Sequence, residues 1–290
     1  MAINEANSDP DCRVIVFTGK GRAFCAGADA QGRFDPATET PEERTRRHAV
    51  AESKKTWNIR RIEEMCFSSD KPIIAAVNGG CVGVGLSLAL GADLIFAANE
   101  AKVGVIFPQR GLIAEEGMAW QLPNRMGTAN ALMMLVTGEV MRAEEWPAGL
   151  FQALFPVRHP KAPFARTLRR LCASCAAADA DVFVVQAEEL MAGTLEWATA
   201  LSVNSSPTAV SVIKQQIYTQ PTMTWKDNQR INDIIQSAST DPTPGANPDH
   251  EEGFDAFLSK REPNFEPLNK ELQFYKNARE QLGSLLPTRL

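Results

Sequence analysis

The chain has 290 residues, of which 44% are apolar and 22% are charged, and its formal net charge is −5. This balance is typical of a water-soluble globular protein with one large core or two smaller ones. An acidic surface disfavours nucleic acid and anionic membranes as partners, so we expect neither. The apolar segment 73–98 is interrupted by Asn78, Ser87, Asp93 and several glycines, which excludes a clean transmembrane span.

Cysteine and histidine do not form a convincing ligand pattern. Cys172 and Cys175 have the spacing of a redox or metal pair, but they lie in an alanine-rich segment with helical character, where such spacing arises by chance. His48, His159 and His250 are scattered and complete no ligand set. We therefore predict no metal site.

The first third of the chain combines one buried strand with a small-residue loop. Met1–Asp11 is interpreted as the end of a helix, and Arg13–Thr18 as a buried strand of branched residues. The strand continues into Gly19–Asp29, a loop of small residues that lets a ligand approach the backbone. Gln31–Glu42 is expected to be a loop and Arg47–Cys66 a helix.

A second strand followed by a glycine-rich segment lies near the middle of the chain. Ile73–Val77 predicts a fully buried strand, Asn78–Gly80 a turn, and Leu86–Leu90 the start of a helix. Gly83 and Gly85 before that helix leave backbone N–H groups free to meet a negatively charged oxygen. Two such loops together could supply two donors to one oxyanion, although a tight turn inside an ordinary core explains each one alone.

The remainder of the chain is predicted to be mainly helical. Gly117–Leu135 is expected to be a helical run broken around Pro123–Gly127, and Asp241–Asp249 a loop. We place a boundary between a core, residues 1–197, and a C-terminal helical module, residues 198–290. Further helices are predicted at Pro163–Ala178, Ala180–Leu201, Pro207–Tyr218, Trp225–Ser237 and Glu251–Leu258.

Four motifs give the chain a family resemblance. GRAFCAGAD, KPIIAAVNG, ADLIFAANEAKVG and EGFDAFLSKREPNF, starting at Gly21, Lys71, Ala92 and Glu252, resemble the crotonase (enoyl-CoA hydratase/isomerase) superfamily in order and spacing. The resemblance implies an α/β fold, a crotonase-type spiral of ββα turns with a C-terminal helical module, assembled as a homotrimer or a pair of trimers. It also implies an acyl-CoA substrate and no cofactor besides that CoA thioester.

The two ends of the chain carry expectations of their own. Members of the family usually have a β-hairpin and most of a helix before the first strand found here, so the core is expected to be N-terminally short. The final Thr288-Arg289-Leu290 resembles the peroxisomal address whose best form is Ser-Lys-Leu, which predicts a peroxisomal location and otherwise a cytoplasmic one. Fatty-acid oxidation and acyl tailoring in secondary metabolism are both compatible with the sequence.

Site residues follow from the resemblance. The oxyanion donors would be the backbone N–H groups of Ala28 and Val84, the latter a valine where the family usually has glycine. Lys260, with Arg261, resembles the motif near the CoA end of the site, although a solvated charged pair is an equal alternative. The neighbours of the two donors are further candidate contacts of the CoA substrate, namely Ala26, Gly27, Asp29 and Gly83.

The choice of reaction depends on where carboxylates stand. Hydratases of the family use two glutamates, whose positions here hold Ser87 and Phe107, so standard hydration is not expected. Glu115 matches the single base of the family's enoyl-CoA isomerases, including peroxisomal ones, with Glu116 as the reserve base. A solvated loop carboxylate is the plainer interpretation of Glu115, and a core aromatic that of Phe107. An enoyl-CoA hydratase with a non-standard acid and a catalytically silent acyl-CoA-binding subunit remain open alternatives.

Overall fold

The structure, a computed structural model, describes residues 2–28, 40, 42, 67–147, 149–151 and 187–283. Some sequence predictions therefore lie outside the described residues: Asp29, the helices Arg47–Cys66 and Pro163–Ala178, Cys172 and Cys175, most of the loop Gln31–Glu42, and Thr288–Leu290.

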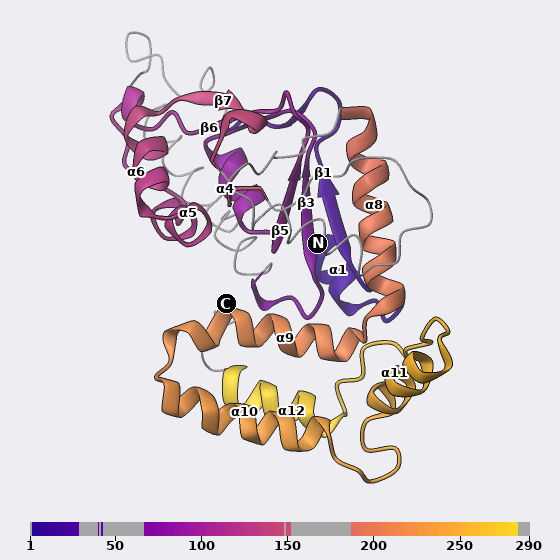
Figure 1. Ribbon diagram of the computed structural model, residues 1–290. Coiled ribbons are helices and arrows are strands. Elements are labelled where there is room, and N and C mark those ends of the chain that lie inside the picture. The colour runs from indigo at the N-terminus through magenta and orange to yellow at the C-terminus, as the bar shows by residue number, and fades with distance from the viewer. Residues whose placement is uncertain are drawn as a thin grey trace.

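Two small sheets form the centre of the first half of the chain (Figure 1). One sheet is parallel, in the order β1-β3-β5, and the other has the order β2-β4-β6-β7, with β7 antiparallel to β6. The bounds are β1 Ile15–Thr18, β2 Ala23–Cys25, β3 Ile73–Val77, β4 Gly80–Val82, β5 Leu94–Ala97, β6 Lys102–Gly104 and β7 Val140–Arg142. Each successive strand pair contributes one strand to each sheet, which is the repeating turn of the predicted spiral.

Strand β3 is the central strand of the three-stranded sheet. All five of its residues are buried, and it pairs in parallel with β1 on one side and β5 on the other. A strand covered on both faces needs a continuous apolar run, which Ile73–Val77 supplies. The strand was predicted from the sequence with these same bounds, and the structure confirms it.

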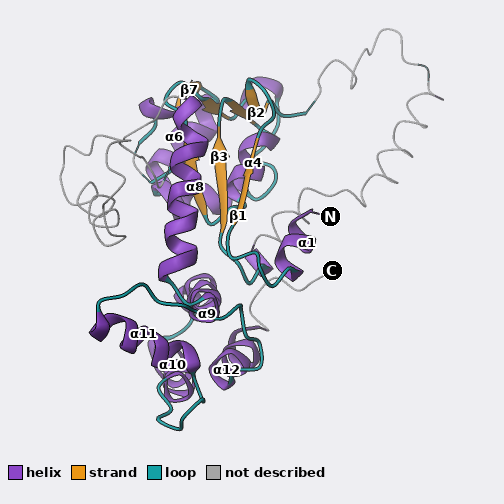
Figure 2. Ribbon diagram, turned by 90° about the vertical axis from the view of Figure 1, so that its right-hand side faces the viewer, coloured by secondary structure: helices purple, strands orange, loops and turns teal. Residues whose placement is uncertain are grey.

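Helices cover both sides of the sheets (Figure 1). On one side lie α4, α5 and α6, and on the other α8 runs along β1 and in front of the strands in Figure 2. Buried residues of the strands and these helices form one hydrophobic cluster. The bounds are α1 Ala2–Ser8, α4 Val84–Leu90, η2 Pro108–Arg110, α5 Met118–Met126, α6 Thr128–Thr137, η3 Ala143–Glu145 and α8 Ala187–Asn204.

The C-terminal helices form a second layer with a core of their own (Figures 1 and 2). The expected boundary at residue 198 falls inside α8, whose residues as far as Leu201 still pack on the first core, whereas the second core draws on residues from Val212 onward. The bounds are α9 Pro207–Thr219, η4 Gln220–Thr222, α10 Trp225–Ser239, α11 Pro248–Ser259 and α12 Gln273–Leu282.

A largely buried ion pair connects α9 to the strands. Lys214 Nζ lies 2.8 Å from Asp93 Oδ2, and Tyr218 donates its hydroxyl to Asp93 Oδ1 at 2.6 Å. Ile73 at the start of β3 donates its backbone N–H to Asp93 Oδ2 at 2.7 Å. These contacts give Asp93 a structural role, because its carboxylate joins the module to the central strand.

A second buried carboxylate, Asp70, joins the module at the amino end of the same strand. Tyr275 of α12 donates to its Oδ1 at 2.8 Å and Lys270 to its Oδ2 at 2.6 Å. Burial alone raises the Asp70 pKa, but the hydrogen bonds from Lys270 and Tyr275, with the charges of Lys270 and Arg279, together bring that pKa below its usual value. The charged form of Asp70 is therefore the one that holds α12 in place.

Two local predictions were wrong. Gly80 was assigned to a turn but begins β4, and Gly19–Asp29 was assigned to a loop but contains β2, because each three-residue strand is stabilised by its parallel partner rather than by its own sequence. The break predicted around Pro123–Gly127 is confirmed: Pro123 lies inside α5, and Gly127, with a φ of 77°, ends that helix before α6 begins. The helix predicted at Leu86 begins two residues earlier, at Val84.

Candidate functional site

The two predicted donor loops follow neighbouring strands of one sheet. β2 and β4 are parallel, with Cys25 opposite Cys81, so both strands end at the same edge. Ala28 lies just beyond the end of β2, and Val84 follows β4 as the first residue of α4. The structure thus brings together the two residues that the sequence proposed as oxyanion donors. We call the segments 26–28 and 83–85 the oxyanion loops.

Glycine allows the oxyanion loops to touch. A Cβ atom on Gly85 would lie 2.0 Å from the carbonyl oxygen of Cys25, and one on Gly27 would lie 2.8 Å from that of Val82. Gly27 also has a φ of 94°, which strains any residue with a side chain. Backbone therefore packs directly on backbone, and the distance between the loops is fixed by these glycines.

The start of α4 leaves donors available. Gly83, the residue before the helix, has a φ of 57° and provides no side-chain cap, while its carbonyl accepts the N–H groups of Leu86 and Ser87. The N–H of Val84 belongs to the first turn, where helical N–H groups have no partner within the helix. The branched side chain of Val84 is half-buried.

The segment after β6 carries the predicted acids. Phe107 has 5% of its surface exposed and belongs to the hydrophobic core, and Gly111 ends η2 in the left-handed conformation. We call Leu112–Gly117, which follows, the acidic loop. Its apolar tip is exposed, whereas Glu115 and Glu116 are half-buried.

Glu116 has two unusual features. Its φ is 53°, a left-handed conformation that is uncommon for a residue with a long side chain. Its Oε2 atom is shielded from solvent and has no hydrogen-bond partner among the described residues. Buried polar atoms are normally satisfied, so this carboxylate oxygen is left available to a group from outside the chain.

Ser87 links the acidic loop to α4. Its side chain is completely buried, and its hydroxyl donates to the carbonyl oxygen of Glu116 at 3.1 Å. Ser87 lies one helical turn after Val84, so the acidic loop packs beside the oxyanion loops. This contact could not be predicted from the sequence, because a hydroxyl and a carbonyl separated by 29 residues leave no pattern in it.

Lys260 is not brought to this site within one copy of the chain. It ends α11 with a φ of 54°, and its neighbour Arg261 pairs with Glu252 at 2.6 Å and Asp255 at 2.5 Å. Phe265, a few residues on, accepts a hydrogen bond from Arg13, which precedes β1 of the three-stranded sheet, whereas the oxyanion loops follow β2 and β4 of the other sheet. Arg261 is thus neutralised by carboxylates.

Neither a metal site nor a membrane span is found in the parts of the chain that the structure covers. Among those residues, no three His, Cys, Asp or Glu side chains are grouped so that they could hold a metal ion. No helix in the same ranges is both long and apolar enough to cross a bilayer. The described residues place the two loops that carry the predicted donors near Glu115 and Glu116, and backbone donors with a carboxylate suit chemistry on a polarised carbonyl.

Comparisons with known proteins agree with the geometry. The family model described as enoyl-CoA hydratase/isomerase matches residues 1–180. An enoyl-CoA hydratase of Alternaria alternata is 28% identical over 269 residues, which are 93% of this chain and 76% of that protein. A 1,2-epoxyphenylacetyl-CoA isomerase of Escherichia coli is 29% identical over 91% of this chain and 84% of that protein.

Solved structures give the same result. An enoyl-CoA hydratase from Bacillus anthracis aligns with a TM-score of 0.66 and 26% identity, covering 91% of this chain and 85% of that one. An enoyl-CoA hydratase subunit from Geobacillus kaustophilus aligns with a TM-score of 0.62 and 28% identity, covering 91% and 84%. The predicted α/β spiral with C-terminal helices is therefore confirmed.

Proposed function

The chain belongs to the enoyl-CoA hydratase/isomerase family, and on that premise we propose that it is an enoyl-CoA isomerase that moves the double bond of a 3-enoyl-CoA to the 2-position. The observation that carries the proposal is the Ser87–Glu116 contact, because it packs the acidic loop against the helix whose first N–H is an oxyanion donor. The reaction needs no group besides the CoA thioester, which is the substrate.

The oxyanion loops stabilise the intermediate. Removal of a proton from C2 places negative charge on the thioester oxygen, which accepts hydrogen bonds from the N–H groups of Ala28 and Val84. Each such donor typically contributes about 3–4 kcal/mol to the transition state. Ala26, Gly27 and Gly83 shape the backbone around that oxygen, and Asp29 follows directly in the sequence.

A carboxylate of the acidic loop moves the proton. We assign this role to Glu115, which matches the base of the family's isomerases, and keep Glu116 as the reserve because one of its oxygens is shielded and unsatisfied. The base takes the C2 proton, the electrons form the conjugated enolate, and the same carboxyl returns the proton at C4. One carboxylate is sufficient, because the reaction neither gains nor loses a proton.

Two further residues disfavour addition of water. Ser87 and Phe107 stand where hydratases of the family carry their two glutamates, and neither side chain can act as a carboxylate. Phe107 is buried in the core and Ser87 donates its hydroxyl to the protein backbone. Isomerisation is therefore favoured over hydration.

Three glutamate variants test the assignment of the base. Glu115→Gln should lower kcat for isomerisation of 3-hexenoyl-CoA by about 10²–10⁴-fold, the usual contribution of a general base. Glu116→Gln should retain most of the activity, and Glu139→Gln, an exposed glutamate before β7, serves as the matched control. A collapse in Glu116→Gln with an active Glu115→Gln would transfer the role to Glu116.

Hydration is the second candidate function. It is favoured by the relatives from Alternaria alternata, which are named enoyl-CoA hydratases, and by the presence of two adjacent carboxylates. Hydration of a 2-enoyl-CoA that survives in Glu115→Gln would support it. Binding of acyl-CoA without turnover in either assay would indicate the third alternative, a silent acyl-CoA-binding subunit.

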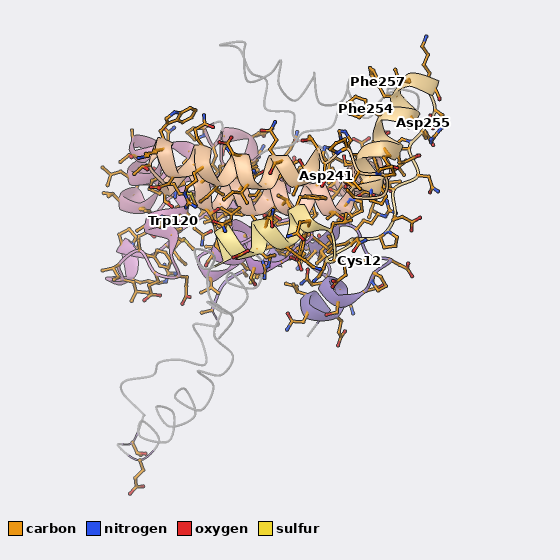
Figure 3. All side chains as sticks on the ribbon, turned by 90° about the horizontal axis from the view of Figure 1, so that it is seen from below. Cys12, Trp120, Asp241, Phe254, Asp255 and Phe257 are labelled. Atoms are coloured by element: carbon orange, nitrogen blue, oxygen red, sulfur yellow. The ribbon has the colours of Figure 1, made fainter. Side chains whose placement is uncertain are left out.

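We also propose that the protein assembles as a homotrimer or a pair of trimers. The α6 helix contains no charged residue, and Leu132 and Val136 on it are 60% and 64% exposed. Figure 3 places Trp120, on the adjacent α5, far from the exposed Phe254 and Phe257 of α11. Two different apolar surfaces on one chain suit a ring of copies joined head to tail.

Such a ring affects the assignment of Lys260. Because Lys260 ends α11 in the C-terminal module, whereas the oxyanion loops follow β2 and β4, its proposed contact with the CoA phosphates would be made to a neighbouring copy.

A further inference from the structure

We infer that Ser87 is a positioning residue of the proposed isomerase, because its hydroxyl holds the acidic loop at a fixed distance from the oxyanion donor on α4. The inference rests on the proposed function and deepens it. Ser87 occupies a position where a hydratase would need a carboxylate, and here the position has acquired a different task.

The side chain of Ser87 points toward the start of α4. In a helix the Cα–Cβ bonds tilt toward the N-terminus, so the side chain of Ser87 points back over the first turn of α4, where Val84 lies. Its hydroxyl donates to the carbonyl oxygen of Glu116 at 3.1 Å in a completely buried position. The carbonyl of the acidic loop is therefore held directly above the turn that supplies a donor.

The backbone of the acidic loop has an uncommon conformation at Glu116. Glu116 and Gly117 both have positive φ, 53° and 73°, and the N–H of Met118 bonds to the carbonyl of Glu115 at 3.1 Å. A left-handed glutamate persists only where its surroundings hold it, since the conformation is strained. Glu116 accepts the hydrogen bond from Ser87. This bond therefore stabilises the conformation that sets the direction of both glutamates.

The helix α5, which follows the acidic loop, is also attached to α4. Arg125 of α5 donates to the carbonyl oxygen of Leu90 at 2.9 Å and also to that of Ala92, at the C-terminal end of α4. Met118 and Leu122 of α5 are completely buried in the main core. The helix α5 is thus attached at the C-terminal end of α4, and the hydrogen bond from Ser87, in the middle of α4, attaches the acidic loop that precedes α5.

Loss of the Ser87 hydroxyl should therefore affect chemistry more than binding. A displacement of about 1 Å between reacting groups costs up to about 10²-fold in rate, so Ser87→Ala should lower kcat for isomerisation by roughly tenfold or more. The KM for 3-hexenoyl-CoA should change by less than about threefold, because the CoA contacts are untouched. Ser87→Cys, with a side chain of similar size but a weak donor, should behave like Ser87→Ala.

Ser69→Ala is the matched control. Ser69 is also a buried serine whose hydroxyl lies within hydrogen-bond distance of a backbone carbonyl, that of Lys71 at 3.0 Å, but it precedes β3 of the three-stranded sheet, whereas the oxyanion loops follow two strands of the other sheet. Ser69→Ala should leave kcat unchanged even where it lowers the melting temperature. Ser87→Thr, which keeps the hydroxyl, should recover most of the wild-type kcat.

Isotope transfer provides a measurement that a purely structural role would not alter. With 3-hexenoyl-CoA deuterated at C2, a well-held base carries part of the label to C4, and a loosened carboxyl exchanges it with solvent first. Ser87→Ala and Ser87→Cys should therefore carry less label to C4 than the wild type and Ser69→Ala. Equal kcat and equal label transfer in Ser87→Ala and the wild type would overturn the inference, whereas a folded wild type without isomerase activity would overturn the proposed function itself.

Discussion

Replacement of Gly85 by alanine probes the contact on which the oxyanion site depends. The added Cβ would lie 2.0 Å from the carbonyl oxygen and 2.9 Å from the Cβ of Cys25. The first distance is roughly 1.4 Å short of an ordinary contact, and the obstructing oxygen is backbone, so no flexible side chain can move aside. The oxyanion loops must separate by about 1 Å, which predicts a loss of up to about 10²-fold in kcat and about 1–3 kcal/mol in stability.

The matched variant is Gly80→Ala in the neighbouring strand β4. There the nearest atom to an added Cβ is the Cβ of Ala23 at 3.9 Å, an ordinary contact. Steady-state kinetics with 3-hexenoyl-CoA and thermal unfolding of both variants give the comparison. Gly80→Ala should resemble the wild type. A folded Gly85→Ala with wild-type kcat would refute the reasoning that direct backbone contact sets the oxyanion geometry.

Three further predictions concern docking and assembly. Lys214→Met should lower the free energy of unfolding in urea by about 1.5–3 kcal/mol, because the Asp93 carboxylate loses its charged hydrogen-bond donor but keeps the bonds from Tyr218 and Ile73; a loss below about 1 kcal/mol would contradict this. The pKa of Asp70 is lowered on folding, so its charged form stabilises the protein above the unfolded value of 3.8 and this contribution disappears as pH falls through the folded pKa. The difference in stability between wild type and Asp70→Asn should accordingly shrink below that pH, and a constant difference would argue against the pair. Leu132→Lys with Val136→Lys should reduce the mass found by light scattering to that of a smaller species, and an unchanged mass would remove α6 from the interface.

The element that was predicted best is the one whose own residues carry the signal. β3 was predicted with its observed bounds because a strand buried on both faces is apolar at every position. β4 and β6 have three residues each and depend on their partner strands, so their sequences contain too few positions to show a period. The helix α12 was missed although Phe274, Tyr275, Ala278 and Leu282 have helical spacing, so that signal was present in the sequence.

Some features of the candidate site could be predicted from the sequence and others could not. Glycines where two loops must meet are visible in the sequence, and Gly27 and Gly85 are indeed where backbone approaches backbone. The positive φ of Glu116 and its hydrogen bond to Ser87 are not visible, because glutamate rarely adopts that conformation and the partner is distant in sequence. The distance of Lys260 from the oxyanion loops likewise depends on how the C-terminal module docks, which no local motif encodes.

The most direct test of the central claim is the partition of the wild-type protein between two reactions. Purified protein would be supplied in parallel with 3-hexenoyl-CoA, to follow formation of the 2-enoyl form, and with 2-hexenoyl-CoA, to follow addition of water. The account predicts rapid isomerisation with negligible hydration. Hydration at a rate equal to or above that of isomerisation would contradict it.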